Sequence, residues 1–371
     1  MLKVGLVGIG FMGHGHLDQY LRLMKEGAPV KLVALCDVDD RKFHEQFTGG
    51  NMGDLGKAQY DFSQFHLYHD FDEMLKNEEL DYVDIALPTY LHCYYTCKAL
   101  NAGHHVLCEK PMAINPTQCR MMIDAAKKNN KKLMIAQCLR FWPAYETLKH
   151  YVDSGEFGKP VFCYFYRGGG WPKWSFQDWL LDENRSGGCL LDQHVHDVDM
   201  VNWLFGMPEA VSTLGRNVNP GGGFDAVTTQ YRYDGFIVNT ADDWSINSPE
   251  FPFKMTYRAN FEKGAVVFED GATTVYPVDG KAFKADDCGG DDGYYREVKY
   301  FIDAILNDKP IETADNESTY RTICLATAER TATSGQPYSF FENQEVRLPT
   351  PSPATVTVPG VILTRASTLW Q

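Results

Sequence analysis

GLVGIGFMGHGH, residues 5–16, carries three glycines, Gly8, Gly10 and Gly13, in the pattern GxGxxG. A short apolar run precedes the pattern and a stretch of helical periodicity follows it, so the segment predicts a strand, a tight turn and a helix. In such a turn the first glycine permits the bend, the second lets a pyrophosphate approach the backbone, and the third lets the helix pack on the strand. The segment therefore predicts a dinucleotide-binding loop whose anion lies at a helix N-terminus.

A second strand-like run, VKLVALCD, ends at Asp37, 24 residues after Gly13. A carboxylate at this point can accept hydrogen bonds from both ribose hydroxyls and repels a 2′-phosphate, so it favours NAD over NADP. Asp39 and Asp40 add negative charge that also repels a 2′-phosphate, whereas the positive charges of Arg41 and Lys42 weaken this repulsion. The prediction is NAD, with NADP disfavoured by Asp37.

The order of periodic segments predicts the fold class. Up to about residue 139, buried-strand candidates such as YVDIAL and KKLMIAQC alternate with helical stretches, which is typical of parallel βαβ units. Longer strand candidates such as PVFCYFYRG and AVTTQYRY follow, and then two helical segments. We therefore expect an α/β chain with an N-terminal doubly wound Rossmann domain, a C-terminal α+β domain built on a large, mostly antiparallel open sheet, and an extension; the expected ranges are 1–139, 140–345 and 346–371.

Composition excludes several classes of partner. The formal charge of −14 argues against nucleic acid and anionic membranes. No stretch has the 18 or so uninterrupted apolar residues of a membrane span, and the N-terminus does not resemble a signal peptide, so a cytoplasmic protein is expected. Ten cysteines occur without any CxxC pair, so the sequence predicts no zinc ribbon.

The segment HVLCEKPMA places Glu109, Lys110 and Pro111 at the carboxyl end of a predicted buried strand. Ligands bind at this edge of open α/β sheets. A partly desolvated lysine there can share a proton with a substrate hydroxyl. The structural alternative is an ordinary surface lysine at the end of a strand.

GGCLLDQHVHDVDMVNWLFG, residues 187–206, concentrates histidine and aspartate. Its apolar spacing favours a helix, in which Asp192, His196 and Asp199 share one face while His194 is turned by about 200° from Asp192. In a strand His194 and His196 would instead share a face and form a good metal pair. Because the helix is favoured, we predict a proton relay and no metal, with Asp197 and Asp199 in capping, ion-pairing or solvated roles.

The strand–GxGxxG–helix, LPTYLHCYYTCKALNAGHHVLCEKP and the 187–206 stretch together resemble the Gfo/Idh/MocA oxidoreductases, over nearly the whole chain to about residue 345. The resemblance implies that Lys110 contacts the reacting hydroxyl and the nicotinamide ribose, and that Asp192 and His196 are the acidic residue and histidine of the second domain. This family often has glycine two residues before the histidine, where this chain has His194.

The resemblance also implies that Pro88, Thr89 and His92 run beside the nicotinamide, and that Arg140 lies near the substrate. Aromatic faces stack on the C–H faces of sugars, so tryptophans after the glycines at 168–170 are pocket candidates, with packing at a domain interface as the alternative. Those glycines suggest a mobile loop that serves as a lid.

The predicted cofactor contacts are Gly8, Gly10, Phe11, Met12, Gly13, Asp37, Pro88, Thr89, His92, Glu109 and Lys110. The predicted substrate contacts are Lys110, Arg140, Trp171, Trp174, Asp192 and His196.

Lys110, Asp192 and His196 are the predicted catalytic residues. The expected reaction is NAD-dependent oxidation of a secondary hydroxyl of a sugar, glycoside or cyclitol, by a homo-oligomer (dimer, tetramer or larger) as the resemblance implies. Three alternatives stay open: a glycoside hydrolase that retains NAD and oxidises its substrate transiently, a non-catalytic nucleotide-binding regulator, and a metal-dependent hydrolase.

Overall fold

The computed structural model describes residues 1–44, 50, 60–248, 250–333, 338–340 and 363–365. Contacts divide the chain into two compact units, each built from three segments. Unit 1 comprises Met1–Trp142, Pro172–Ser186 and Cys288–Tyr320, and unit 2 comprises Pro143–Trp171, Gly187–Asp287 and Arg321–Gln371.

The sequence placed both 172–186 and 288–320 in the second domain, whereas their contacts place them in unit 1. Val298, Phe301 and Ile302 of the later segment pack in the hydrophobic core of unit 1, and Trp174 of the earlier one contacts Phe11. The predicted domain boundaries themselves stay predictions. Most of the predicted extension, 346–362 and 366–371, lies outside the described residues.

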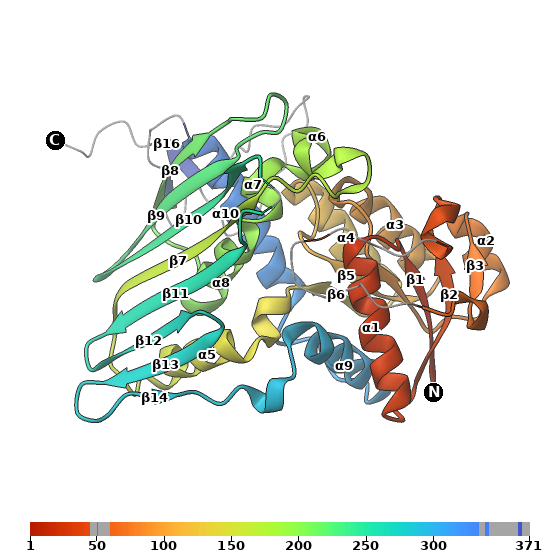
Figure 1. Cartoon of the computed structure of the whole chain (residues 1–371), viewed down its shortest axis with the longest axis horizontal. Helices are drawn as coiled ribbons and strands as arrows, with labels where there is room; N and C mark the ends of the chain where they lie inside the picture. The colour runs from red at the N-terminus through yellow and green to blue at the C-terminus, as the bar shows by residue number, and fades with distance from the viewer. Residues whose placement is uncertain (45–49, 51–59, 249, 334–337, 341–362, 366–371) are drawn as a thin grey trace. The chain divides into compact units, whose positions relative to one another are not determined.

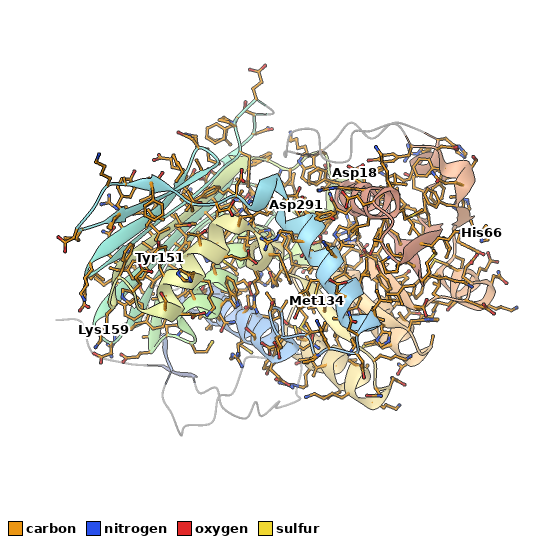
Figure 2. All side chains as sticks on the ribbon, turned by 90° about the horizontal axis from the view of Figure 1, so that it is seen from below. Asp18, His66, Met134, Tyr151, Lys159 and Asp291 are labelled. Atoms are coloured by element: carbon orange, nitrogen blue, oxygen red, sulfur yellow. The ribbon has the colours of Figure 1, made fainter. Side chains whose placement is uncertain are left out.

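Unit 1 contains a six-stranded parallel sheet in the order β3-β2-β1-β4-β5-β6, which confirms the predicted doubly wound fold (Figure 1). Its strands are β1 (Leu2–Val7), β2 (Val30–Cys36), β3 (His66–Tyr68), β4 (Tyr82–Ile85), β5 (His105–Glu109) and β6 (Leu133–Ala136). The central strands read as nearly continuous apolar runs because helices cover both faces of a parallel sheet. Met134 of β6 is fully buried, whereas His66 of the edge strand β3 is exposed (Figure 2).

The helices of unit 1 include one that comes from late in the chain. They are α1 (Phe11–Lys25), α2 (Phe71–Asn77), α3 (Thr89–Asn101), α4 (Pro116–Lys128), α6 (Glu183–Ser186) and α9 (Gly293–Leu306). Helix α9 packs beside α1: the rings of Tyr82 and Phe301 lie 5.3 Å apart, and the Arg22 guanidinium lies 3.8 Å above the Tyr295 ring. Apolar burial and a cation–π contact therefore hold α9 on the Rossmann sheet.

Unit 2 is built on a ten-stranded sheet in the order β14-β13-β12-β11-β7-β10-β9-β8-β15-β16. Among the described strands of this sheet only β7 and β10 pair in parallel, so the predicted mostly antiparallel open sheet is confirmed. The strands are β7 (Pro160–Gly170), β8 (Ala210–Arg216), β9 (Ala226–Tyr233), β10 (Phe236–Ile246), β11 (Lys254–Phe261), β12 (Gly264–Glu269), β13 (Ala272–Pro277), β14 (Phe283–Lys284), β15 (Tyr338–Phe340) and β16 (Leu363–Arg365).

Helices of unit 2 lie along this sheet (Figure 1). They are α5 (Pro143–Ser154), α7 (Gly188–Asp192) and α8 (Val195–Phe205), together with the part of α10 (Asn316–Ala332) from Arg321 onward. The suggested lid at residues 168–170 is wrong, because these glycines form the end of β7 and pair with β10 and β11. Among the described residues, no helix has both the length and the apolar character that crossing a bilayer requires.

Candidate active site

Each glycine of the phosphate loop in unit 1 has a different environment. Gly8 has φ +90°, and a Cβ atom there would lie 2.5 Å from the carbonyl oxygen of Ala86. A Cβ at Gly13 would lie 1.8 Å from the carbonyl oxygen of Gly8, whereas a Cβ at Gly10 would meet no described atom within 4 Å. Packing inside the protein therefore requires Gly8 and Gly13, while a side chain at Gly10 would meet none of the described residues at the positive end of α1.

Asp37 follows β2, the neighbour of β1 in the sheet, and reaches the same loop. Its Oδ2 accepts a hydrogen bond from the backbone N–H of Ile9 at 2.7 Å, and its Oδ1 accepts one from the N–H of Asp39 at 2.9 Å. The Arg41 guanidinium is paired with Asp39 at 2.7 Å. Asp37 thus fixes the phosphate loop as well as standing where a ribose is expected.

The loops after β4 and β5 are joined through a buried histidine. His92 lies on α3, and its ring nitrogens are 2.8 Å from the carbonyl oxygen of Pro111 and 2.7 Å from that of Leu87. Burial lowers the pKa of His92 despite these two hydrogen bonds. His92 therefore connects the two loops structurally. Thr89, at the start of α3, has a buried hydroxyl without a hydrogen-bond partner among the described residues.

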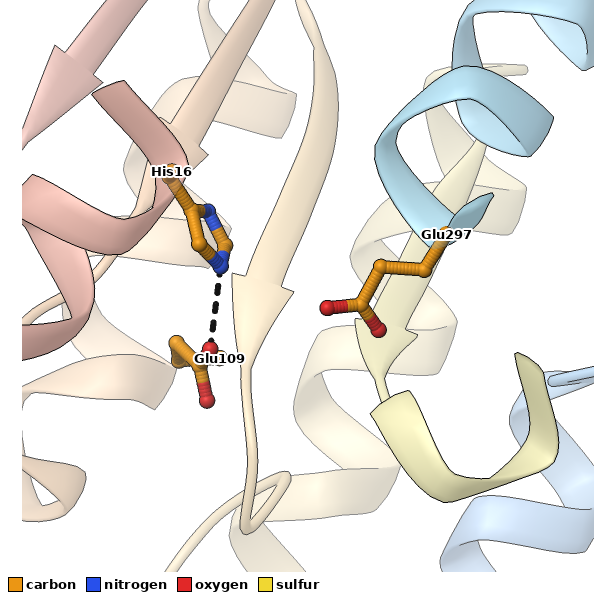
Figure 3. Close-up of side chains that lie close together, drawn as sticks. All are labelled: His16, Glu109 and Glu297. Atoms are coloured by element: carbon orange, nitrogen blue, oxygen red, sulfur yellow. Dashed lines mark hydrogen bonds and ion pairs between the residues drawn. The ribbon is translucent and has the colours of Figure 1, made fainter. Parts of the chain in front are cut away.

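Glu109 ends β5 and holds the backbone of Lys110. Its Oε2 accepts the N–H of Lys110 at 3.0 Å, and its Oε1 lies 3.0 Å from His16 Nε2 (Figure 3). The other ring nitrogen of His16 lies 2.8 Å from Asp84 Oδ2, which also accepts the Tyr20 hydroxyl at 2.6 Å. The carboxyl ends of β2, β1, β4 and β5 thus gather the predicted cofactor residues at one edge of the sheet.

Three predicted residues of unit 1 sit in less open positions. Phe11 is buried, and its ring lies edge-on to Trp174 with 5.0 Å between centroids, while Met12 is half-buried. Arg140 has no exposed surface, and its guanidinium donates to the carbonyl oxygen of Thr313 and to Ser318 Oγ, both at 3.0 Å. Arg140 therefore anchors this turn inside unit 1, a geometry that does not favour the predicted substrate contact.

In unit 2 the predicted continuous helix over 187–206 is wrong, because it breaks between α7 and α8. The N–H of His194 bonds to the carbonyl oxygen of Cys189 at 2.8 Å, five residues back, which widens the turn. Asp192 ends α7 and His196 is the second residue of α8; both are half-buried. The expected spacing of four along one unbroken helix therefore does not describe this pair.

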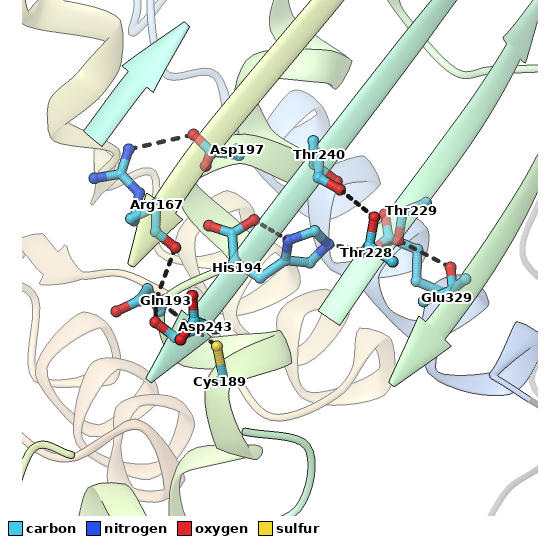
Figure 4. Close-up of polar contacts among 12 residues, drawn as sticks. Arg167, Cys189, Gln193, His194, Asp197, Thr228, Thr229, Thr240, Asp243 and Glu329 are labelled. Carbon is cyan, nitrogen blue, oxygen red and sulfur yellow. Dashed lines mark hydrogen bonds and ion pairs between the residues drawn. The ribbon is translucent and has the colours of Figure 1, made fainter. Parts of the chain in front are cut away.

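The side chain of His194 holds the break between α7 and α8 in place through two carboxylates (Figure 4). The side chain is fully buried, and its ring nitrogens lie 2.5 Å from Asp242 Oδ2 on β10 and 2.6 Å from Glu329 Oε2 on α10. Burial alone would lower the pKa of His194, but the carboxylates of Glu329 and Asp242 raise it to about 10. His194 is therefore an imidazolium that ties the helix break to a strand and a second helix.

Neighbouring aspartates of the 187–206 stretch are also buried in unit 2. Asp197 lies 3.2 Å from the Arg167 guanidinium, and burial raises its pKa to about 8 despite this ion pair. Asp199 accepts the Thr322 hydroxyl at 2.7 Å. Trp171, which directly follows β7, is half-buried and donates its backbone N–H to the carbonyl oxygen of Ile246 at 2.9 Å. Asp197 and Asp199 thus have internal partners.

Several residues of these clusters were not foreseen. His16, Asp84 and Glu297 in unit 1 are buried, as are Asp242 and Glu329 in unit 2. Two of them had a signal: Asp84 is the one carboxylate in the apolar strand YVDIAL, and His16 stands inside the phosphate-loop segment itself. The others are distant in the sequence from the residues they meet.

Comparison with known proteins agrees with a Rossmann unit joined to an open-sheet unit. Residues 2–137 match the Gfo/Idh/MocA profile described as "Oxidoreductase family, NAD-binding Rossmann fold", and residues 145–267 match a "GFO/IDH/MocA C-terminal domain". The two matches together span more than half of the chain, which belongs to the Gfo/Idh/MocA family.

Among its relatives, inositol 2-dehydrogenase of Salmonella paratyphi B is 29% identical over 55% of this chain and 54% of the relative. The 2,7-anhydro-N-acetylneuraminate hydratase of Mediterraneibacter gnavus is 28% identical over 57% of this chain and 53% of the relative. The chain thus matches about half the length of these relatives. A structure titled levoglucosan dehydrogenase, complex with NADH and levoglucosan, has the same fold, with a TM-score of 0.76, 21% identity and coverage of 90% of this chain and 97% of that one.

Two of the three glycines in the phosphate loop, Gly13 and Gly10, provide a matched test. Gly13→Ala forces a Cβ against the Gly8 carbonyl, so we expect it to lower the free energy of unfolding by about 1–3 kcal/mol. Gly10→Ala meets no described atom, so we expect an unchanged melting temperature but at least about tenfold weaker NAD binding, from the one contact it blocks. Calorimetry and thermal unfolding measure both. Equal NAD affinity of Gly10→Ala and wild type would contradict a phosphate at this loop.

Asp37→Ala should change cofactor preference. Losing a charged hydrogen-bond acceptor for the ribose costs about 1.5–3 kcal/mol, so the KM for NAD should rise about 10- to 100-fold while the KM for NADP rises less or falls. Because Asp37 also holds Ile9, an equal rise for both cofactors would instead indicate a distorted loop. Asp72→Ala, on α2 with a side chain that is 64% exposed, is the control and should leave both KM values unchanged.

His194→Gln should leave Asp242 and Glu329 buried without their cation, so we expect the free energy of unfolding at pH 7 to fall by about 3–5 kcal/mol. Folding raises the pKa of His194, so its stabilisation is complete below about pH 6.5 and is lost as the pH rises to about 10. The difference from wild type should therefore shrink over that range in denaturant titrations. His150→Gln, exposed in the same unit, is the control; a pH-independent difference would rule out an imidazolium at position 194.

Proposed function

We propose that this chain is an NAD-dependent oxidoreductase that transfers a hydride between nicotinamide and a secondary carbinol of a sugar, glycoside or cyclitol. The observation that carries the proposal is the phosphate loop itself: a Cβ at Gly10 would meet no described atom within 4 Å, and a carboxylate, Asp37, reaches the loop from the end of the neighbouring strand. The family membership supports it, as do the relatives whose names describe an inositol 2-dehydrogenase and a levoglucosan dehydrogenase.

The residues of unit 1 fit a dinucleotide. The loop offers a backbone that a pyrophosphate can approach, and the buried Thr89 hydroxyl has no hydrogen-bond partner among the described residues. NAD is proposed rather than NADP, because Asp37 is negative and the nearby Arg41 is paired with Asp39. When bound, the cofactor supplies the hydride acceptor, and the protein supplies orientation and charge.

The proposed roles follow from the chemistry of the side chains. His196 accepts the hydroxyl proton, since imidazole is suited to general-base work near neutral pH. The Lys110 ammonium donates a hydrogen bond to the same oxygen as negative charge develops there. Asp192 accepts hydrogen bonds from neighbouring hydroxyls of the substrate and so orients the ring. Trp171 and Trp174 are proposed to stack on the sugar.

A second candidate is a reaction in which the sugar is oxidised only transiently and NAD stays bound. One relative is named a 2,7-anhydro-N-acetylneuraminate hydratase. A hydratase carries out no net oxidation, so this name favours the second candidate. A glycoside hydrolase of this kind would release an aglycone. Homo-oligomeric assembly and a cytoplasmic location stay predictions from the sequence.

Lys110→Met and His196→Ala test the assignment. Each removes a group that acts on the reacting hydroxyl, so we expect kcat to fall about 10²- to 10⁴-fold while NAD still binds. Lys98→Met and His150→Ala, both at surface ion pairs, are the matched controls and should retain wild-type rates.

The reaction itself is read from a panel of polyols, cyclitols and glycosides with NAD, following absorbance of NADH and ketone formation together. Net NADH with a ketone supports the dehydrogenase. An aglycone or a hydrated product without net NADH supports the retaining reaction. Turnover at wild-type rates in both variants contradicts the proposed roles, and binding of NAD without turnover of any compound favours a regulator.

A further inference from the structure

Three side chains with metal-ligand chemistry meet in the core of unit 1. His16 comes from α1, Glu109 from the end of β5, and Glu297 from α9 (Figure 3). One nitrogen or oxygen atom of each lies within 4.8 Å of those of the other two, and all three residues are buried. The cluster therefore brings one imidazole and two carboxylates into one small buried region.

No described hydrogen bond explains why the carboxylate of Glu297 is buried. Its side chain has no exposed surface, and neither carboxylate oxygen has a hydrogen-bond partner among the described residues. Most charged groups near it, Glu109, Asp84 and Asp292, are negative. A buried carboxylate in such surroundings needs either a proton or a cation.

A proton would remove the charge of Glu297 but would leave a buried O–H that has no acceptor among the described residues. A cation satisfies the oxygen directly and offsets both glutamates together. The 3.0 Å between His16 Nε2 and Glu109 Oε1 also suits a shared ion, because ligand atoms about 2.0–2.2 Å from one metal lie roughly 3–3.5 Å apart.

The surroundings of His16 match those of a metal-bound histidine. A ligating imidazole normally donates its second ring N–H to a carboxylate, which fixes the ring and makes the ligand nitrogen more basic. His16 Nδ1 lies 2.8 Å from Asp84 Oδ2, and the Tyr20 hydroxyl holds the same oxygen at 2.6 Å. The ring is therefore oriented with Nε2 toward Glu109.

We propose that His16, Glu109 and Glu297 bind one divalent metal ion. Imidazole with two carboxylates is a donor set for Zn²⁺ or Mn²⁺ rather than for soft ions. The ion would join α1, β5 and α9, and through Glu109 Oε2 it would brace the backbone of Lys110. The sequence predicted no metal because the ligands are scattered along the chain; His16 and Glu109 are 93 positions apart. This proposal does not depend on the proposed reaction.

The test uses the full chain without a histidine tag, purified without chelator. Elemental analysis should find close to one Zn or Mn per chain. After EDTA treatment the melting temperature should fall by several degrees, and added ZnCl₂ or MnCl₂ should restore it. Glu297→Gln should contain less than a tenth of the wild-type metal and should not respond to either salt.

His66→Asn is the matched control, because His66 is 71% exposed and pairs with a carboxylate, Glu78, in the same unit, and the variant should keep its metal. Wild-type chain without stoichiometric metal, whose melting temperature ignores both EDTA and added salt, would overturn the site. So would a Glu297→Gln variant as stable as wild type in the presence of metal, since a glutamine replaces a protonated glutamate well. If Glu297→Gln fails to fold, the wild-type measurements alone decide.

Discussion

Helix α1 can begin where it does because residue 13 has no side chain. A Cβ there would lie 1.8 Å from the carbonyl oxygen of Gly8, so any other residue would push the helix away from β1. With the helix in place, its N-terminus faces the edge of the sheet where β2, β1, β4 and β5 end. Asp37, Thr89 and Lys110 reach that edge from three different strand ends, so the nucleotide half of the proposed site depends on this one close approach.

Each unit also contains a buried histidine held between two carboxylates. In unit 1 His16 lies between Asp84 and Glu109, and the second of these holds the N–H of Lys110. In unit 2 His194 lies between two carboxylates and stands two residues before His196. Buried contacts between a histidine and carboxylates are strong and costly to leave incomplete, so they restrict the backbone tightly. At His194 both contacts are hydrogen bonds, whereas a shared ion is proposed between His16 and Glu109. Both arrangements thus limit the motion of the segment that carries a proposed catalytic residue.

The parts of the fold that the sequence predicted are those with local causes. Strand and helix periodicity, the glycine pattern and Asp37 at the end of a strand each depend on neighbours within about one βαβ unit. The break between α7 and α8 could not be predicted in this way, because the partners of His194 are 48 and 135 residues away. The burial of Glu297 could not be predicted for the same reason, because it depends on α9, late in the chain, packing in unit 1. The lid predicted at the glycines 168–170 was wrong because the prediction relied on local composition, which suggests a loop. Pairing with the distant strands β10 and β11 makes this segment part of β7.

The histidine at position 194 depends on the same electrostatics. A lone histidine in so buried a place would be an uncompensated charge or an imidazole without partners. Asp242 and Glu329 alone would be two buried carboxylates in repulsion. The three residues are therefore stable only together, and as a set they determine where α7 ends and α8 begins. Asp192 and His196 stand on opposite sides of that break, so their spacing depends on His194, Asp242 and Glu329, which hold it.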